Sequence, residues 1–202
     1  MNLFKNKYRT ESTRLKNWDY SQEGAYFITI CTQNMTCFFG DIKNGKMKLN
    51  EIGEIAHKYW QEIPNHFPNT ILDEFVIMPN HVHGILIIAK KIASPNVETP
   101  NLGVSTERNT NHKPEWKPNS LGSIINQYKR ICTIESRSIN PNFTWQPRYY
   151  DRIIRNKNEL NRIREYIINN PLKWELDRNN PNNLKKSHPR RDAQFGRLYK
   201  RS

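Results

Sequence analysis

Two histidines separated by a single residue stand inside an otherwise apolar segment, residues 75–88. Successive side chains of a β-strand point to opposite faces, so His81 and His83 would lie on one side of a sheet and Val82 on the other. Two imidazoles on one side can bind a divalent cation. The alternative is a pair of sheet histidines hydrogen-bonded to backbone carbonyls, and zinc enzymes also use the His-x-His pattern. The pair alone therefore leaves its chemistry open.

A second segment with chemical potential is a helical pattern from Lys157 to Asn169. Tyr166 and Asn170 fall one turn apart, at the margin of the face that would pack on the protein. The alternative is a boundary tyrosine that only packs and an asparagine that caps the helix before Pro171. The packed face is an apolar stripe of Leu160, Ile163 and Ile167.

The combination is more informative than either segment. A tyrosine that attacks a phosphodiester needs a cation to polarise the phosphate oxygens. Two imidazoles and one side-chain oxygen would leave open positions for phosphate and water, and Asn170 could supply the oxygen. Mixed nitrogen and oxygen ligation suits Mg²⁺ or Mn²⁺, although imidazoles also accept other transition metals. Arg162, one turn before Tyr166, and Lys173 could favour the phenolate or contact phosphate.

The charge balance predicts an anionic partner. Among 202 residues, 32 are Lys or Arg and 19 are Asp or Glu, a net charge of +13. Aromatic residues interleave with the basic ones, which favours nucleic acid over a merely solvated surface. The arm at residues 1–16 and the tail at 185–202 are expected to contact DNA. The individual basic residues expected to bind DNA are Arg14, Lys129, Arg130, Arg148, Arg152, Arg155, Arg162 and Lys173.

The sequence lacks a run of apolar residues long enough for a membrane span, and its beginning lacks a secretory pattern. A cytoplasmic protein is therefore expected. Cys31, Cys37 and Cys132 are widely spaced and have no CxxC pattern. They are interpreted as buried, reduced thiols.

The expected organisation is an α+β domain, with a mainly antiparallel sheet and helices packed against it. A basic arm (residues 1–24) precedes the domain (25–176), and a basic tail (177–202) follows it. A polar segment at residues 90–118 is expected to be a mobile insertion. The expected strands are Ala25–Thr32, Cys37–Ile42, Lys46–Asn50, Ile71–Ile77 and His81–Ala89, with an extended segment at Phe143–Ile154; the expected helices are Asn50–Ile63, one capped by Ser120 and running to about residue 136, and Lys157–Asn169.

Two sequence blocks together resemble one family. They are Met78–Ile85 (MPNHVHGI) and Tyr166–Pro171 (YIINNP). With the basic helix before the second block, they look like the single-tyrosine HUH transposases, in particular the REP-associated tyrosine transposases of bacteria. Supporting segments are YFIT from Tyr26, LGSIINQYK from Leu121 and WQPRYYDRII from Trp145. The resemblance covers roughly residues 15–176.

The resemblance implies a ferredoxin-like or RRM-like fold. It implies that His81 and His83 are metal ligands, Asn170 the third ligand and Tyr166 the nucleophile. The implied reaction is cleavage of single-stranded DNA beside a hairpin, such as a REP-like repeat, through a 5′-phosphotyrosine that a 3′-hydroxyl later resolves. The implied setting is a bacterial cytoplasm, with the protein associated with the nucleoid when bound.

Other hypotheses remain at this point. A non-catalytic, basic nucleic-acid-binding module of RRM-like fold would use the same charge and aromatic residues. A zinc hydrolase would need a third histidine or carboxylate and a general base. A domesticated relative could nick repeats without moving as an element. The protein could act as a monomer or as a homodimer.

Overall fold

The computed structural model describes residues 18–89 and 118–184. The expectations for the basic arm, including Arg14, for residues 90–117 of the insertion and for the tail at 185–202 lie outside the described residues.

The centre of the molecule is a sheet of four antiparallel strands in the order β4-β5-β1-β6. The two longest-range pairings join β1 to β5 and to β6, so β1 lies inside the sheet. A separate hairpin pairs β2 with β3. The strands are β1 (Gly24–Cys31), β2 (Gly40–Lys43), β3 (Lys46–Leu49), β4 (Thr70–Met78), β5 (His81–Ile88) and β6 (Tyr150–Ile154). The expected β4–β5 hairpin is confirmed.

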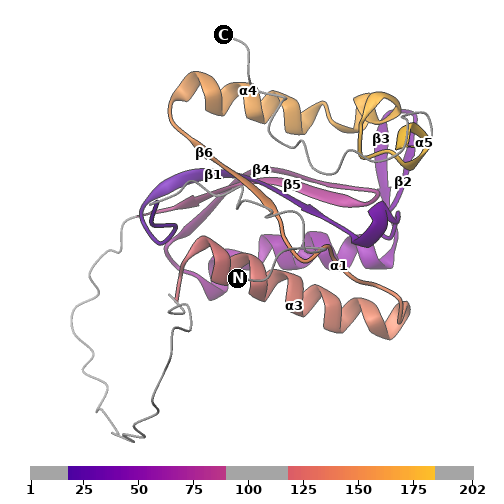
Figure 1. Cartoon of the computed structure of the whole chain (residues 1–202), viewed down its shortest axis with the longest axis horizontal. Helices are drawn as coiled ribbons and strands as arrows, with labels where there is room; N and C mark the ends of the chain where they lie inside the picture. Colours follow the sequence, from indigo (N-terminus) through magenta and orange to yellow (C-terminus); the bar gives the residue numbers. More distant parts are fainter. Residues whose placement is uncertain (1–17, 90–117, 185–202) are drawn as a thin grey trace, which may run out of the picture.

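Helices cover both faces of this sheet (Figure 1). The helix α1 (Glu51–Gln61), followed by the short α2 (Ile63–His66), packs with α3 (Leu121–Ile139) on one face. The helix α4 (Lys157–Ile168) lies across the other face. Along the chain the four-stranded sheet follows a β-α-β-β-α-β order, which is the ferredoxin-like arrangement. The expected α+β fold with flanking helices is therefore confirmed. The remaining short helices are η1 (Gln33–Met35), η2 (Pro171–Leu176) and α5 (Pro181–Leu184).

Polar residues start the three long helices at the positions that favour them. The side chains of Asn50, Ser120 and Asn156 each accept a hydrogen bond from the backbone N–H three residues later. These caps satisfy N–H groups that have no partner inside the helix. The cap by Ser120 agrees with the sequence prediction.

The alternation of side chains along β1 and β5 divides the interior into two cores. Tyr26, Ile28 and Ile30 face α1 and α3, whereas Phe27 faces α4 with Ile163. The larger core contains the fully buried Trp60 of α1, which lies against Gly84 of β5. A Cβ at position 84 would collide with the Trp60 indole, so glycine is required there by close packing. The α4 side carries a smaller apolar core and leaves room for polar groups.

One expectation about the cysteines is wrong. Cys31 and Cys132 are buried free thiols, but Cys37 is exposed. Cys37 lies just before β2 and belongs to neither core, so its thiol is not covered by packing. Among the described residues, no helix is both long and apolar enough to cross a membrane.

Candidate active site

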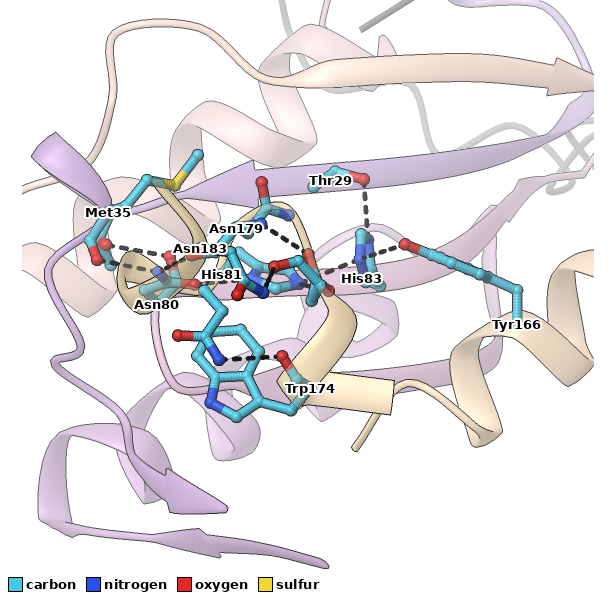
Figure 2. A network of polar contacts seen from close by, with 12 residues as sticks. Thr29, Met35, Asn80, His81, His83, Tyr166, Trp174, Asn179 and Asn183 are labelled. Carbon is cyan, nitrogen blue, oxygen red and sulfur yellow. Dashed lines mark hydrogen bonds and ion pairs between the residues drawn. The ribbon is translucent and has the colours of Figure 1, made fainter. Parts of the chain in front are cut away.

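His81 and His83 lie on β5 and face α4. His81 exposes 0% and His83 2% of its surface to solvent, and their Nε2 atoms are 3.0 Å apart. Val82, between them, is buried in the opposite core. The strand register places His83 beside Thr29 of β1 and Val76 of β4, so the pair stands on interior strands of the sheet. The expected placement of both imidazoles on one side is therefore correct (Figure 2).

The hydrogen bonds of Asn80 determine which nitrogen of His81 carries a proton. The Asn80 amide nitrogen donates to the backbone carbonyls of Met35 (2.8 Å) and Asn179 (2.7 Å). Its oxygen therefore faces His81 Nδ1, 2.8 Å away, and can only accept a proton. His81 Nδ1 must carry the hydrogen. When the ring is neutral, Nε2 thus presents a lone pair towards His83.

His83 can meet that lone pair in two ways. Its Nδ1 lies 2.8 Å from Thr29 Oγ1, a hydroxyl that can donate or accept. If Thr29 donates, His83 Nε2–H can donate to His81 Nε2. If Thr29 accepts, both Nε2 lone pairs point at one place, where a cation or a hydrogen-bond donor could meet them. The geometry is therefore compatible with either a shared proton or a metal ion.

Burial keeps both histidines neutral. It holds the pKa of His81 well below its usual range, with the neighbouring His83 adding to the effect. Burial also lowers the pKa of His83 to about 3. A neutral imidazole retains the lone pair that a metal requires.

The Tyr166 hydroxyl reaches this pair from α4, 3.2 Å from His83 Nε2. Its ring packs edge-on against Phe27 of β1, with ring centroids 6.0 Å apart. The helix is held on the sheet by Arg164, which bonds both carboxylate oxygens of Asp73 on β4 at 2.8 and 2.5 Å. One chain thus supplies the histidines and the tyrosine.

Asn170 and Asp177 line the same cavity as His83, and each carries a side-chain oxygen that could bind a cation. Asn170 is 2% exposed, and its Oδ1 atom has no hydrogen-bond partner among the residues that the structure describes. Asp177 Oδ2 lies 4.0 Å from His81 Nε2, and burial raises the pKa of its carboxyl group. A carboxylate oxygen of Asp177 and a nitrogen of each histidine lie within 4.8 Å of one another.

Sequence reasoning missed Asp177. The expected boundary at residue 177 assigned it to the basic tail, whereas residues 177–184 lie against the site (Figure 2). Asn179 and Asn180 are buried there, and Asn180 donates to the carbonyl of Trp174. The only signal was a single acidic residue at the start of a strongly basic segment.

This donor set fits a divalent cation. Two neutral imidazole nitrogens converge, an amide oxygen is buried without a partner, and a carboxylate stands nearby. Mn²⁺ and Mg²⁺ accept oxygen ligands, and imidazole suits transition metals such as Mn²⁺. Among the described residues this is the one group of at least three such side chains arranged to hold a metal.

A cavity of about 260 Å³ opens beside these groups. His83, Tyr166, Asn170 and Asp177 line its polar part. Phe27, Tyr150 and Leu176 line the rest, and Lys173 and Arg178 bring positive charge to it. The nucleophile candidate thus shares one opening with three of the candidate metal ligands, whereas His81 is fully buried beside His83.

The other basic residues expected to bind DNA are dispersed. Arg148, Arg155 and Arg162 are exposed. Arg152 bonds Glu159 at 2.7 Å, which ties β6 to α4.

Two of the expected DNA contacts, Lys129 and Arg130, lie on α3, across the sheet from α4 (Figure 1). The Lys129 ammonium donates to the Gln146 carbonyl at 2.5 Å, and burial lowers its pKa to about 8. Arg178, which sequence reasoning did not select, lines the cavity instead.

Among solved structures, the fold is similar to that of a REP-associated tyrosine transposase bound to a REP hairpin. The TM-score is 0.51 and the identity 17%, over 82% of this chain and 74% of that one. This likeness establishes a shared fold. A candidate transposase from Deinococcus radiodurans is 15% identical over 77% of this chain and 97% of that one, with a TM-score of 0.41, too low to support an argument.

The sequence comparison places the chain more narrowly. It is 40% identical over 171 residues to an uncharacterized protein of Haemophilus influenzae. The matched residues make up 84% of this chain and 92% of that protein. The chain belongs to the same family as this protein. No family model matches the chain.

Proposed function

We propose that this chain is a metal-dependent nuclease and strand transferase that acts on single-stranded DNA beside hairpins. The observation that carries the proposal is the Tyr166 hydroxyl, 3.2 Å from the Nε2 atom of a buried, neutral histidine pair. A tyrosine at the edge of an open cavity, next to a candidate cation site, is the arrangement that nucleophilic attack on a phosphodiester requires.

In the proposed reaction Tyr166 Oη bonds to the phosphorus, and the bond from phosphorus to the 3′-oxygen breaks. The phenolic proton leaves to solvent in the cavity, and the departing 3′-oxygen takes one up. The product is a 5′-phosphotyrosine and a free 3′-hydroxyl. A second 3′-hydroxyl reverses the step and rejoins a strand, so the number of phosphate ester bonds is conserved and no external energy source is needed.

His81, His83 and Asn170 are the proposed metal ligands, and Asp177 is added to them on the basis of its position. A bound Mg²⁺ or Mn²⁺ would supply a Lewis acid for the phosphate oxygens. Thr29 orients His83, and Asn80 orients His81 through its fixed amide. Such supporting hydrogen bonds determine which nitrogen is available to a metal. Lys173 and Arg178 are placed to bind the phosphates on either side.

The proposed substrate rests on two further points. The protein of similar fold was solved with a REP hairpin, which makes hairpin DNA the first substrate to test. The net charge of +13 suits a polyanion. Since the histidines and Tyr166 come from one chain, we propose that a monomer suffices for cleavage.

The test uses labelled single-stranded hairpin DNA from the genomic flanks of the gene, with Mg²⁺, Mn²⁺ or EDTA. Wild-type protein should form an adduct that survives denaturation, and peptide mapping should locate it on Tyr166. Tyr166→Phe keeps the ring packing against Phe27 and should bind DNA without forming the adduct. Tyr59→Phe is the control, because Tyr59 lies on α1 and packs against the larger core, on the face of the sheet opposite α4. An adduct on Tyr128, Tyr149 or Tyr150, or none with either metal, would refute the proposal.

A non-catalytic binding module is the weaker hypothesis. It would explain the positive charge, but it gives no reason for a tyrosine hydroxyl beside two buried, converging imidazoles. Burying unpaired polar atoms such as Asn170 Oδ1 costs stability, so their retention favours a ligand that binds them.

A further inference from the structure

The cavity beside Tyr166 has an apolar part that the proposed chemistry does not use. Phe27 lies on the sheet, Tyr150 begins β6, and Leu176 ends η2. Leu176 is 86% exposed, the highest value among the large apolar residues described. A single exposed leucine is common on protein surfaces, but Leu176 lines the same cavity as Phe27 and Tyr150 and is therefore accessible to a ligand there.

The apolar part adjoins the reacting groups. The Phe27 ring stacks on His83 with centroids 5.4 Å apart, and it meets the Tyr150 ring edge-on at 6.4 Å. Tyr166 stands on the same Phe27 ring, with centroids 6.0 Å apart. The buried Phe27 ring therefore connects Tyr150 to both His83 and Tyr166.

We propose that Tyr150 and Leu176 form a subsite for one unpaired nucleobase next to the scissile phosphate, with the nearly buried Phe27 ring as its floor. This inference rests on the proposed function and adds a site for recognition of the strand. Aromatic rings bind bases by stacking, and apolar side chains such as leucine can wedge beside them. Lys173 and Arg178, which line the same cavity, would bind the phosphates of that nucleotide.

The size and charge of the cavity favour a base over other occupants. At about 260 Å³ it falls just below the range of small-ligand pockets, a size that suits a single heteroaromatic ring. The polar lining offers a hydrogen-bond acceptor, the unpartnered Asn170 Oδ1, to a base edge or to the metal. The basic residues disfavour a cationic or purely apolar ligand.

The binding test uses the full chain with Tyr166→Phe, which cannot cleave, and hairpin DNA carrying 2-aminopurine at each unpaired position beside the stem. One position should show strong quenching on binding, because its base stacks on aromatic rings. Adding Leu176→Ala should reduce that quenching at least twofold. Leu172→Ala is the matched control: Leu172 is also in η2 and 67% exposed, but it lies against Gly45 and not in the cavity. It should leave the quenching unchanged.

The activity test uses the protein with Tyr166 intact. Removing the base at the quenched position should slow adduct formation about tenfold, and Leu176→Ala should slow it similarly with intact DNA. Leu176→Ala acting on DNA without that base should form the adduct little more slowly than either change alone, because both changes remove the same contact. Equal quenching at all positions, or equal effects of Leu172→Ala and Leu176→Ala, would overturn the subsite. Loss of the adduct on every DNA refutes the proposed function instead, and the quenching experiment still decides the subsite.

Discussion

Acid should destabilise this protein by an amount that the buried histidine pair determines. The pKa of His83 is lowered to about 3 by burial, against an ordinary value of 6.5. Below pH 6.5 the unfolded chain binds a proton that the folded chain does not, so the free energy of unfolding falls as the pH falls. Between pH 7.5 and pH 5 this difference amounts to about 2 kcal/mol from His83. His81, whose pKa is also lowered, acts in the same direction.

The size of this effect is large against a total stability of about 5–15 kcal/mol. The chosen pH window separates it from the carboxyl groups, whose ordinary pKa values are lower. Burial raises the pKa of Asp177, which opposes the effect, whereas Arg164 lowers that of Asp73.

The assay is urea-induced unfolding in EDTA at pH 7.5 and pH 5. The wild type should lose at least about 2 kcal/mol between the two pH values, and His83→Gln should lose about 2 kcal/mol less than the wild type. The comparison between pH values within each variant removes any direct effect of the substitution on folding. His66→Gln, at an exposed position, is the control for replacing a histidine elsewhere. If His83→Gln keeps the full pH dependence, the buried neutral pair is not its source.

Three further results are expected. Asp177→Asn should weaken Mn²⁺ binding about tenfold or more in calorimetry, and an unchanged affinity would remove Asp177 from the proposed ligands. Gly84→Ala should destabilise the fold by about 1–3 kcal/mol in urea unfolding, because the new Cβ meets Trp60; wild-type stability would show that the indole can shift. Asp73→Asn should slow adduct formation several-fold with Mn²⁺ affinity unchanged, because Arg164 loses the carboxylate that holds α4 on β4. A wild-type rate would mean that the helix does not need this ion pair.

The local spacing of residues was sufficient to predict where several side chains of the candidate site lie. Strand alternation placed His81 and His83 on one face, because neighbouring side chains of any strand alternate. Helical periodicity placed Tyr166 at the margin of α4, because the spacing of a turn is the same in every helix. Asn170 was expected at the same margin, but α4 ends at Ile168 and Asn170 lies just before η2, where it is 2% exposed. The sequence could therefore predict which strand side chains share a face, whereas the position of Asn170 depends on how the chain leaves α4.

Tertiary packing decided the features that no local period encodes. Asp177 reaches His81 only because the chain after η2 folds back over β5, a step that depends on contacts of Asn179 and Asn80 far apart in sequence. Lys129 was expected to bind DNA from its residue type, whereas its ammonium donates to the backbone carbonyl of Gln146, a contact that only the folded chain brings about.

Features set by residue spacing therefore differ from features set by the folded surroundings of each side chain. The sequence by itself determined the α+β class, the antiparallel hairpin and most of the residues proposed to bind a metal or attack a phosphate, because these depend on residue type and spacing. Burial, hydrogen-bond direction and the approach of distant segments belong to the folded chain alone. These features make His83 neutral, leave Asn170 Oδ1 without a partner and form one cavity from Phe27, Tyr150 and Leu176.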